Sequence, residues 1–226
     1  MSGMKLVIFD LDGTLIDTVS LFVDTIRSVL ETIGEPVPDE KTIRSISGLG
    51  VQVGIRRIAP ALDDGKIDGV IELYRKETMA RVKKSMQEEF FPGAMEALNI
   101  LHGRQDIVMA VATGKPMAST NRILELHRVK GLFTSIHTPD TNIAKPDPDM
   151  ILDAMAIVDV APQRTVMIGD TTHDMEMAAN AGSHGLGVSW GYHDPDELKA
   201  AGADMIIDDM DQLMPAIDIL LESKNA

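Results

Sequence analysis

The chain has 226 residues and no cysteine, which excludes disulfides, thiolate catalysis and zinc–thiolate sites. A hydrophobic fraction of 44% and a charged fraction of 25% are typical of a folded globular protein, and a net charge of −14 argues against nucleic acid as a partner. No segment approaches the roughly 20 apolar residues of a membrane span, and the apolar run at 6–9 is too short for a signal peptide, so we expect a cytoplasmic protein.

The first predicted element is a buried strand over residues 6–9, and the section that follows it is rich in helix. Apolar spacing between residues 14 and 91 predicts helices and no convincing strand. The expected helices cover residues 19–33, 41–46, 51–58 and 66–82. The simplest account is an α-helical module inserted directly after the first strand, with residues 90–93 as the return.

From residue 92 onward, predicted helices and strands alternate. Short, nearly continuous apolar runs predict further strands at 107–112, 134–136 (the weakest), 165–168, 185–188 and 205–207. Helical patterns cover residues 92–101, 117–126, 148–158 and 172–181. We therefore expect a doubly wound, Rossmann-like parallel α/β sheet formed by residues 1–13 and 92–226.

The strongest candidate site is the segment Asp10-Leu11-Asp12-Gly13-Thr14 at the end of the first strand. Two carboxylates beside a buried strand are costly to desolvate, and a cation next to them would offset that cost. Gly13 permits a tight turn with free backbone amides. An acidic turn that caps the next helix would explain Asp12 and Gly13, but it would not explain Asp10 directly at the strand.

Other polar residues also follow predicted strands. Asp170 comes directly after the strand at 165–168 and its Gly169, and Asp174 lies four residues further on, where a helix N-terminus alone would favour a carboxylate. Thr113 and Gly114 follow the strand at 107–112 and could bind one phosphate oxygen, or could only cap a helix.

A lysine joins this set because Pro146 fixes the direction of the chain after Lys145. Taken alone, Lys145 could equally be a solvated surface lysine. In an open α/β sheet, however, ligands bind at the carboxyl ends of the strands, where we expect these residues to meet. Oxygen ligands without cysteine suit a hard cation, and Mg²⁺ is the natural candidate beside a phosphate.

These residues, in this order, resemble the four sequence motifs of the haloacid dehalogenase superfamily. The resemblance covers nearly the whole chain, and the position of the insert is similar to that in members with an α-helical cap, such as the phosphoglycolate phosphatases. It implies a core domain of residues 1–13 and 92–226 and an α-helical cap domain of residues 14–91.

The resemblance also implies roles. Asp10 would be the nucleophile, Asp12 the general acid and base, and Thr113 and Lys145 would contact the phosphoryl group together with Gly114. Mg²⁺ would be bound by Asp10, the backbone carbonyl of Asp12 and Asp170, with support from Asp174, whether as a direct ligand or through another ligand. The expected activity is hydrolysis of small phosphate monoesters through an aspartyl-phosphate.

Several alternatives stay open. A phosphoglucomutase-like phosphoryl transferase would keep both aspartates, but those enzymes carry a histidine where this chain has Val19, Ser20 and Leu21. Nucleotides or pyrophosphate could replace a small monoester as the substrate, and a binding module without catalysis is a third reading. Arg56, after Gly54, is a candidate for binding a substrate anion, or half of a solvated basic pair with Arg57. The protein could be a monomer or a homodimer.

Overall fold

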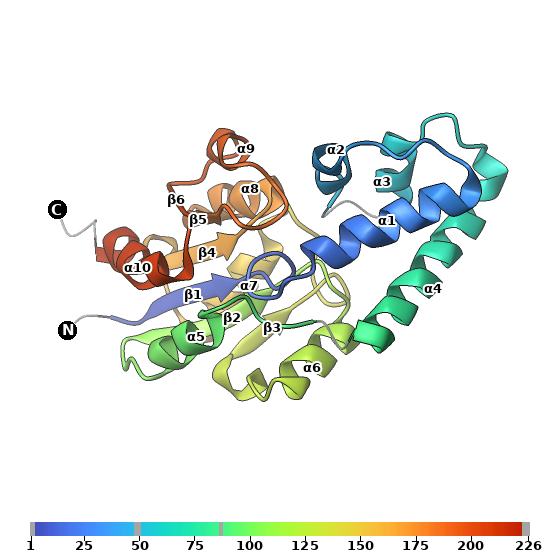
Figure 1. Cartoon of the computed structure of the whole chain (residues 1–226). Coiled ribbons are helices and arrows are strands. Elements are labelled where there is room, and N and C mark those ends of the chain that lie inside the picture. Colours follow the sequence, from blue (N-terminus) through green and yellow to red (C-terminus); the bar gives the residue numbers. More distant parts are fainter. Residues whose placement is uncertain (1–2, 48–50, 86–87, 223–226) are drawn as a thin grey trace. The chain divides into compact units, whose positions relative to one another are not determined.

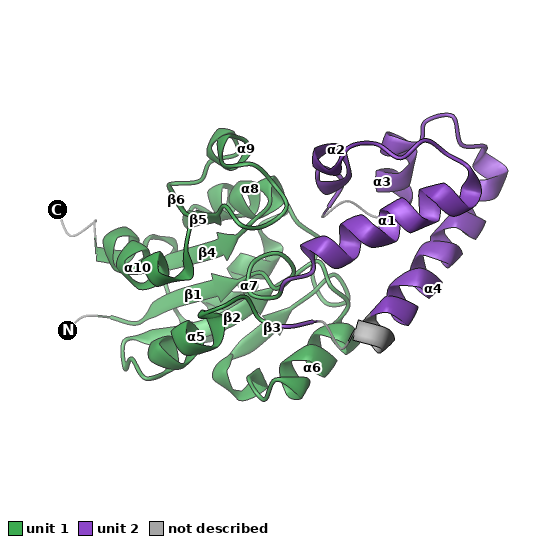
Figure 2. Ribbon diagram, in the orientation of Figure 1, with its two compact units in different colours: residues 1–16, 90–226 green, residues 17–89 purple. Residues whose placement is uncertain are grey.

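The computed structural model describes residues 3–47, 51–85 and 88–222. The chain divides into two compact units (Figure 2): unit 1 is Met1–Ile16 with Phe90–Ala226, and unit 2 is Asp17–Glu89. None of the described helices has both the length and the apolar character that crossing a membrane requires.

Unit 1 contains a six-stranded sheet in the order β3-β2-β1-β4-β5-β6, with every neighbouring pair parallel (Figure 1). Val7 of β1 lies opposite Met109 of β2 and Val166 of β4, which fixes the register at the centre of the sheet. The strands are β1 Lys5–Phe9, β2 Ile107–Ala112, β3 Ser135–His137, β4 Thr165–Gly169, β5 His184–Val188 and β6 Met205–Ile207. The predicted α/β fold with a parallel sheet is confirmed.

Helices connect these strands: α5 Ala94–His102, α6 Met117–Leu126, α7 Asp149–Val158, α8 Thr172–Ala181, α9 Pro195–Ala200 and α10 Leu213–Glu222. The first four match predicted helices to within two residues. The sequence did not predict α9 and α10. Short 3-10 turns, at Lys130–Leu132, Pro162–Arg164 and Met210–Gln212, complete the connections.

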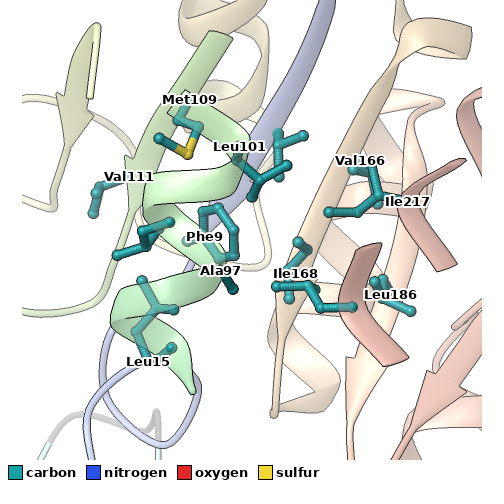
Figure 3. Close-up of a cluster of buried hydrophobic side chains, with 14 of the residues drawn as sticks. Phe9, Leu15, Ala97, Leu101, Met109, Val111, Val166, Ile168, Leu186 and Ile217 are labelled. Atoms are coloured by element: carbon teal, nitrogen blue, oxygen red, sulfur yellow. The ribbon is translucent and has the colours of Figure 1, made fainter. Parts of the chain in front are cut away.

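Both faces of the sheet are covered, which explains why its strands are apolar throughout rather than alternating. Val7 and Phe9 face a core cluster that includes α5 and α10 (Figure 3), whereas Leu6 and Ile8 face a second cluster that includes α7 and α8. All four of these β1 side chains are fully buried. Each stabilises the fold by about 1.5–3 kcal/mol relative to an exposed position.

Unit 2 is helical in its described part, with α1 Val19–Ile33, α2 Glu40–Arg44, α3 Val51–Ile58, a 3-10 turn Asp64–Lys66 and α4 Ile67–Ser85. Its own core cluster joins Ile26 and Leu30 of α1 with Ile43 of α2, Ile55 of α3 and Val70 of α4. The helices thus bury their apolar faces against one another.

The boundary between the units differs from the expected 14–91. The structure places residues 14–16 and 90–91 in unit 1. Ile16 forms bridges with both Asp12 and Phe90, and the N–H of Phe91 donates to the carbonyl of Leu15 at 2.9 Å. The entering and returning segments are therefore held to each other for a few residues beyond β1, which apolar periodicity does not reveal.

An ion-pair network ties the start of β1 to the loop before β2 and to α10. Arg104 contacts Asp218 at 2.6 Å and Asp106 at 3.1 Å, and Asp106 also lies 3.3 Å from the Lys5 ammonium. The hydrogen bond from Arg104 lowers the pKa of Asp106 to about 2, from its usual 3.8. The pKa of Asp106 is lower in the folded state than in the unfolded state. The stabilisation from its ion pairs is therefore complete well above pH 3.8 and is lost as pH falls toward 2.

Replacing Asp106 by Asn should lower the free energy of unfolding by about 1 kcal/mol at pH 7, because the Asp106 side chain is 33% exposed and solvent screens part of the attraction. Urea denaturation would show the deficit narrowing as pH falls below about 4. Asp208→Asn, at an exposed site, is the matched control. A deficit that is the same at pH 3 and pH 7 would exclude charge pairing as its source.

Candidate active site

The candidate site lies at the carboxyl ends of β1 and β4, where the strand order reverses direction. Such a switch point is the usual place for a ligand in an open α/β sheet. Asp10 directly follows β1, and its N–H donates to the carbonyl of Ile168 in β4 at 2.9 Å. Asp170 directly follows β4. The two carboxylates thus leave adjacent strands at the same edge of the sheet.

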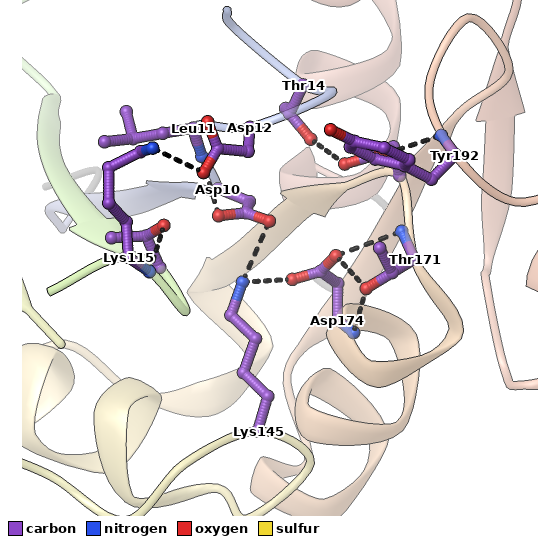
Figure 4. A network of polar contacts seen from close by, with 11 residues as sticks. Asp10, Leu11, Asp12, Thr14, Lys115, Lys145, Thr171, Asp174 and Tyr192 are labelled. Carbon is purple, nitrogen blue, oxygen red and sulfur yellow. Dashed lines mark hydrogen bonds and ion pairs between the residues drawn. The ribbon is translucent and has the colours of Figure 1, made fainter. Parts of the chain in front are cut away.

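Asp10 is almost completely buried, with 6% of its surface exposed. One carboxylate oxygen accepts the Leu11 N–H at 2.7 Å, and the other lies 3.1 Å from the Lys145 ammonium (Figure 4). The pKa of Asp10 is raised from 3.8 to about 6, mainly because the group is buried; Lys145 lowers it, and Asp174 and Asp12 contribute to the increase. Lys145 thus only partly offsets the effect of burial on the pKa of Asp10.

Lys145 is shared between two aspartates. Its ammonium lies 2.5 Å from Asp174 as well as 3.1 Å from Asp10. Burial lowers the pKa of Lys145, but attraction to Asp10 and Asp174 raises it above its usual range, so the amine is charged. Asp174 is fixed in turn by Thr171, whose hydroxyl and N–H donate to its second oxygen at 2.6 and 3.1 Å in a capping box at the start of α8.

Asp170 is fully buried and is held by hydrogen bonds rather than by an ammonium. The Thr14 hydroxyl donates to one oxygen at 2.7 Å and the Tyr192 N–H to the other at 2.8 Å. Burial, followed by repulsion from Asp10 and Asp174, raises the pKa of Asp170 well above its usual value. This carboxylate therefore has a strong electrostatic preference for a nearby cation.

Three carboxylates meet here with little positive charge to balance them. Asp10, Asp170 and Asp174 each offer one oxygen, and these oxygens lie within 4.8 Å of one another. Hard oxygen ligands, burial and the raised pKa values of Asp10 and Asp170 together fit a divalent cation such as Mg²⁺. The Asp12 carboxylate lies outside this cluster.

Two glycines allow the segments around Asp170 to approach closely. Gly13 has a φ of +79°, which favours glycine, and a Cβ there would lie 2.2 Å from an oxygen of Asp170. A Cβ on Gly191 would lie 2.2 Å from the Cβ of Asp170. The loop after β5 can therefore donate the Tyr192 N–H only if residue 191 has no side chain.

Gly191→Ala should displace Asp170 and weaken Mg²⁺ binding at least about tenfold, with a stability loss of about 1–3 kcal/mol from overpacking. Isothermal titration with Mg²⁺ and thermal unfolding would measure the two effects. Gly131→Ala, where a Cβ meets no atom within 4 Å, is the control. Unchanged Mg²⁺ affinity in Gly191→Ala would show that Asp170 does not depend on this close approach.

The segment after β2 supplies Thr113, Gly114 and Lys115. The Thr113 N–H donates to His137 at 3.1 Å, and its hydroxyl accepts the Lys115 N–H at 3.2 Å. Thr113 is buried, whereas Gly114 is exposed. Since Phe9 pairs with Val111, Thr113 leaves the sheet at the same edge as Asp10. Contact of Thr113 and Gly114 with phosphate stays a prediction.

Lys115 reaches Asp12, with 3.0 Å between its ammonium and one carboxylate oxygen (Figure 4). The other oxygen of Asp12 is buried and has no hydrogen-bond partner among the described residues. Arg56, the candidate for contacting substrate, belongs to α3 of unit 2 and forms an ion pair with Asp64 there. Its role as a substrate ligand stays a prediction.

Sequence reasoning singled out the aspartates, Thr113 and Lys145 but not the contacts that Thr171, Gly191, Tyr192 and Lys115 make around them. The contact of Thr171 with Asp174 had a signal, because a threonine three residues before an aspartate fits a capping box. Gly191 and Tyr192 follow another strand end, which was a usable signal. The contact between Lys115 and Asp12 had no signal in the spacing of the two residues.

Comparisons with known proteins agree with this geometry. Residues 7–188 match the haloacid dehalogenase-like hydrolase family. The chain is 36% identical to a probable phosphatase, IndB, of Dickeya dadantii, over 96% of this chain and 95% of that protein. It is 30% identical to a phosphoglycolate phosphatase of Pseudomonas putida, over 93% and 79%. A crystal structure of a putative haloacid dehalogenase-like hydrolase from Bacteroides fragilis superimposes with a TM-score of 0.79, at 27% identity over 93% and 99%.

Proposed function

Because this chain is a phosphatase of the haloacid dehalogenase-like hydrolase family, we propose that it hydrolyses small phosphate monoesters with Mg²⁺ through an aspartyl-phosphate on Asp10. The observation that carries the proposal is the Asp10 carboxylate at the sheet switch point, flanked by Lys145 and by two further buried aspartates. The relatives named phosphoglycolate phosphatase favour a small substrate of this kind.

Asp10 serves as the nucleophile. A carboxylate oxygen of Asp10 forms a bond to phosphorus while the bond from phosphorus to the ester oxygen breaks. The ammonium of Lys145, charged and 3.1 Å from Asp10, reduces the repulsion between the nucleophile and the phosphoryl oxygens. The Thr113 hydroxyl and the Gly114 N–H donate hydrogen bonds to those oxygens.

Asp12 moves the proton. It protonates the departing ester oxygen, then accepts a proton from the water that attacks the aspartyl-phosphate, which releases phosphate and restores both aspartates. The Asp12 oxygen without a described partner is the atom suited to this task, because the other oxygen already contacts Lys115.

Asp10, Asp170, Asp174 and the backbone carbonyl of Asp12 would hold Mg²⁺, which when bound neutralises charge on the phosphoryl group. Without it, burial together with repulsion among the aspartates raises the pKa of Asp10 to about 6 and raises the pKa of Asp170 well above its usual value. Thr14, Thr171 and Tyr192 keep the metal-free carboxylates in position by their hydrogen bonds.

Unit 2 would act as the cap that covers the site and contacts the leaving group. The family resemblance and the helical content of residues 17–89 support this role. We propose that Arg56 contacts a substrate anion. To do so, Arg56 must break its ion pair with Asp64 and form one with the substrate.

A panel of phosphate esters assayed with Mg²⁺, with EDTA and with Mg²⁺ restored tests the proposal. Phosphate release should require Mg²⁺ and should exceed sugar-phosphate isomerisation on any hexose phosphate in the panel. Separately, Mg²⁺ should raise the melting temperature of the wild type but not of Asp170→Asn, because ligand binding stabilises the folded state. Full activity in EDTA, or isomerisation faster than phosphate release, would overturn the proposal.

A further inference from the structure

We propose that Lys115 determines specificity for the leaving group, favouring phosphate esters whose leaving group carries a negative charge close to the ester oxygen. The inference rests on the proposed function, because it takes Asp12 to be the residue that protonates the leaving group. It adds a subsite in unit 1 itself, independent of Arg56 and of the rest of unit 2.

The ammonium of Lys115 is held at the site rather than extended into solvent. Its side chain is 16% exposed, and its nitrogen lies 3.0 Å from Asp12. The backbone is fixed as well: the Lys115 N–H donates to the Thr113 hydroxyl at 3.2 Å, and its carbonyl accepts from Thr120 at 3.4 Å. Lys115 therefore presents a positive charge in a restricted position.

That position is the leaving-group side of the reaction centre. An acid that protonates the leaving oxygen must come within about 2.6–3.2 Å of it. Since one oxygen of Asp12 has no described partner and the other contacts Lys115, a substrate engaging the first oxygen places its leaving group next to the ammonium. A carboxylate or phosphate one or two bonds beyond the ester oxygen would then reach Lys115.

The surrounding charges make this ammonium important for an anionic leaving group. Asp10, Asp12, Asp170 and Asp174 all repel a second anion, and the Lys145 ammonium is already shared between Asp10 and Asp174. Figure 4 shows Lys145 directed to that pair and Lys115 directed to Asp12. A neutral leaving group is neither repelled by the aspartates nor attracted by the Lys115 ammonium.

Two nearly isosteric esters separate the effect of Lys115 on the leaving group from any effect on Asp12. 2-Phosphoglycolate has a carboxylate where 2-hydroxyethyl phosphate has a neutral hydroxymethyl group. Lys115→Met should reduce kcat/KM for the carboxylate ester roughly 30-fold, as expected for a hydrogen bond to a charged group, and for the neutral ester by no more than about threefold. Lys115→Arg should retain part of the preference.

Lys130→Met is the matched control, because Lys130 pairs with Glu125 on an exposed surface; it should leave both rates unchanged. Equal losses on the two esters would overturn the inference while leaving the proposed function intact, since Lys115 would then act only through Asp12. Unchanged rates on both esters in Lys115→Met would overturn it as well. A wild type that hydrolyses neither of these esters nor any other in the panel would overturn the proposed function and this inference together.

Discussion

Replacing Asp10 by Asn should reduce turnover of every phosphate ester by at least about 10⁴-fold, because an amide cannot form the acyl-phosphate bond. The loss should be the same for esters with good and poor leaving groups, since no covalent step remains for either. The loss of turnover is measured as steady-state phosphate release with saturating Mg²⁺. Asp208→Asn, a substitution of the same type at an exposed site of unit 1, should retain wild-type turnover.

The variant should not lose stability, which distinguishes a lost nucleophile from a damaged fold. Burial raises the pKa of Asp10 to about 6, above its unfolded value of 3.8. A carboxyl group with a raised pKa costs stability once pH exceeds the unfolded value, and at pH 7 that cost is fully present in the metal-free protein. In EDTA, Asp10→Asn should therefore melt at or above the wild-type temperature. A lower melting temperature together with the lost activity would contradict this account of the charge.

Replacing Asp12 by Asn should separate the two halves of the reaction. A p-nitrophenyl leaving group departs without a proton, so Asp10 should still be phosphorylated, whereas hydrolysis of the aspartyl-phosphate loses its general base and slows about 10²–10⁴-fold. Stopped-flow absorbance should show a burst of about one p-nitrophenolate per enzyme, followed by slow turnover. An alkyl phosphate should give no burst, because its leaving group needs the proton.

The Asn side chain keeps an oxygen that can accept from Lys115, so the local structure should persist in Asp12→Asn. A variant with no burst on the aryl ester and equal losses on both esters would contradict separate roles for the two aspartates. An unchanged steady-state rate would exclude Asp12 from proton transfer altogether.

The parallel sheet and the positions of the candidate site residues at its strand ends could be predicted from the sequence because each signal was local. The run at 6–9 is apolar at every position, since Leu6 and Ile8 face one core cluster while Val7 and Phe9 face the other. Placing Asp10, Thr113 and Asp170 at strand ends then required only the rule that parallel strands share an edge.

What the sequence did not reveal depends on contacts between distant segments. The Tyr192 N–H reaches Asp170 because Gly191 lacks a side chain, and Lys115 reaches Asp12 across neighbouring strand ends. The position of Gly191 and Tyr192 after a strand end is a local signal, but the pairing with Asp170 is not visible in it, and the contact of Lys115 with Asp12 leaves no local pattern. The compact units divide a few residues inside the expected domain boundary for the same reason, since the bridge between Ile16 and Phe90 joins residues far apart in the chain.

The balance of charge at Asp10 also could not be read from the sequence. Burial, with added repulsion from Asp174 and Asp12, raises the pKa of Asp10 to about 6 although the shared Lys145 ammonium lowers it. The size of each effect on the pKa depends on how deeply the carboxyl group is buried and on its distance from the neighbouring charges. Residue identities show neither.

The most direct test of the central claim is to trap the phosphorylated enzyme. Acid quenching of Asp12→Asn during turnover of an aryl phosphate, followed by peptide mass spectrometry, should find one phosphoryl group, stable in acid and labile to hydroxylamine, on Asp10. The double variant that also carries Asp10→Asn should show none. Phosphate attached to another residue, or a burst of p-nitrophenolate without any protein-bound phosphate, would contradict the assignment of Asp10 as the nucleophile.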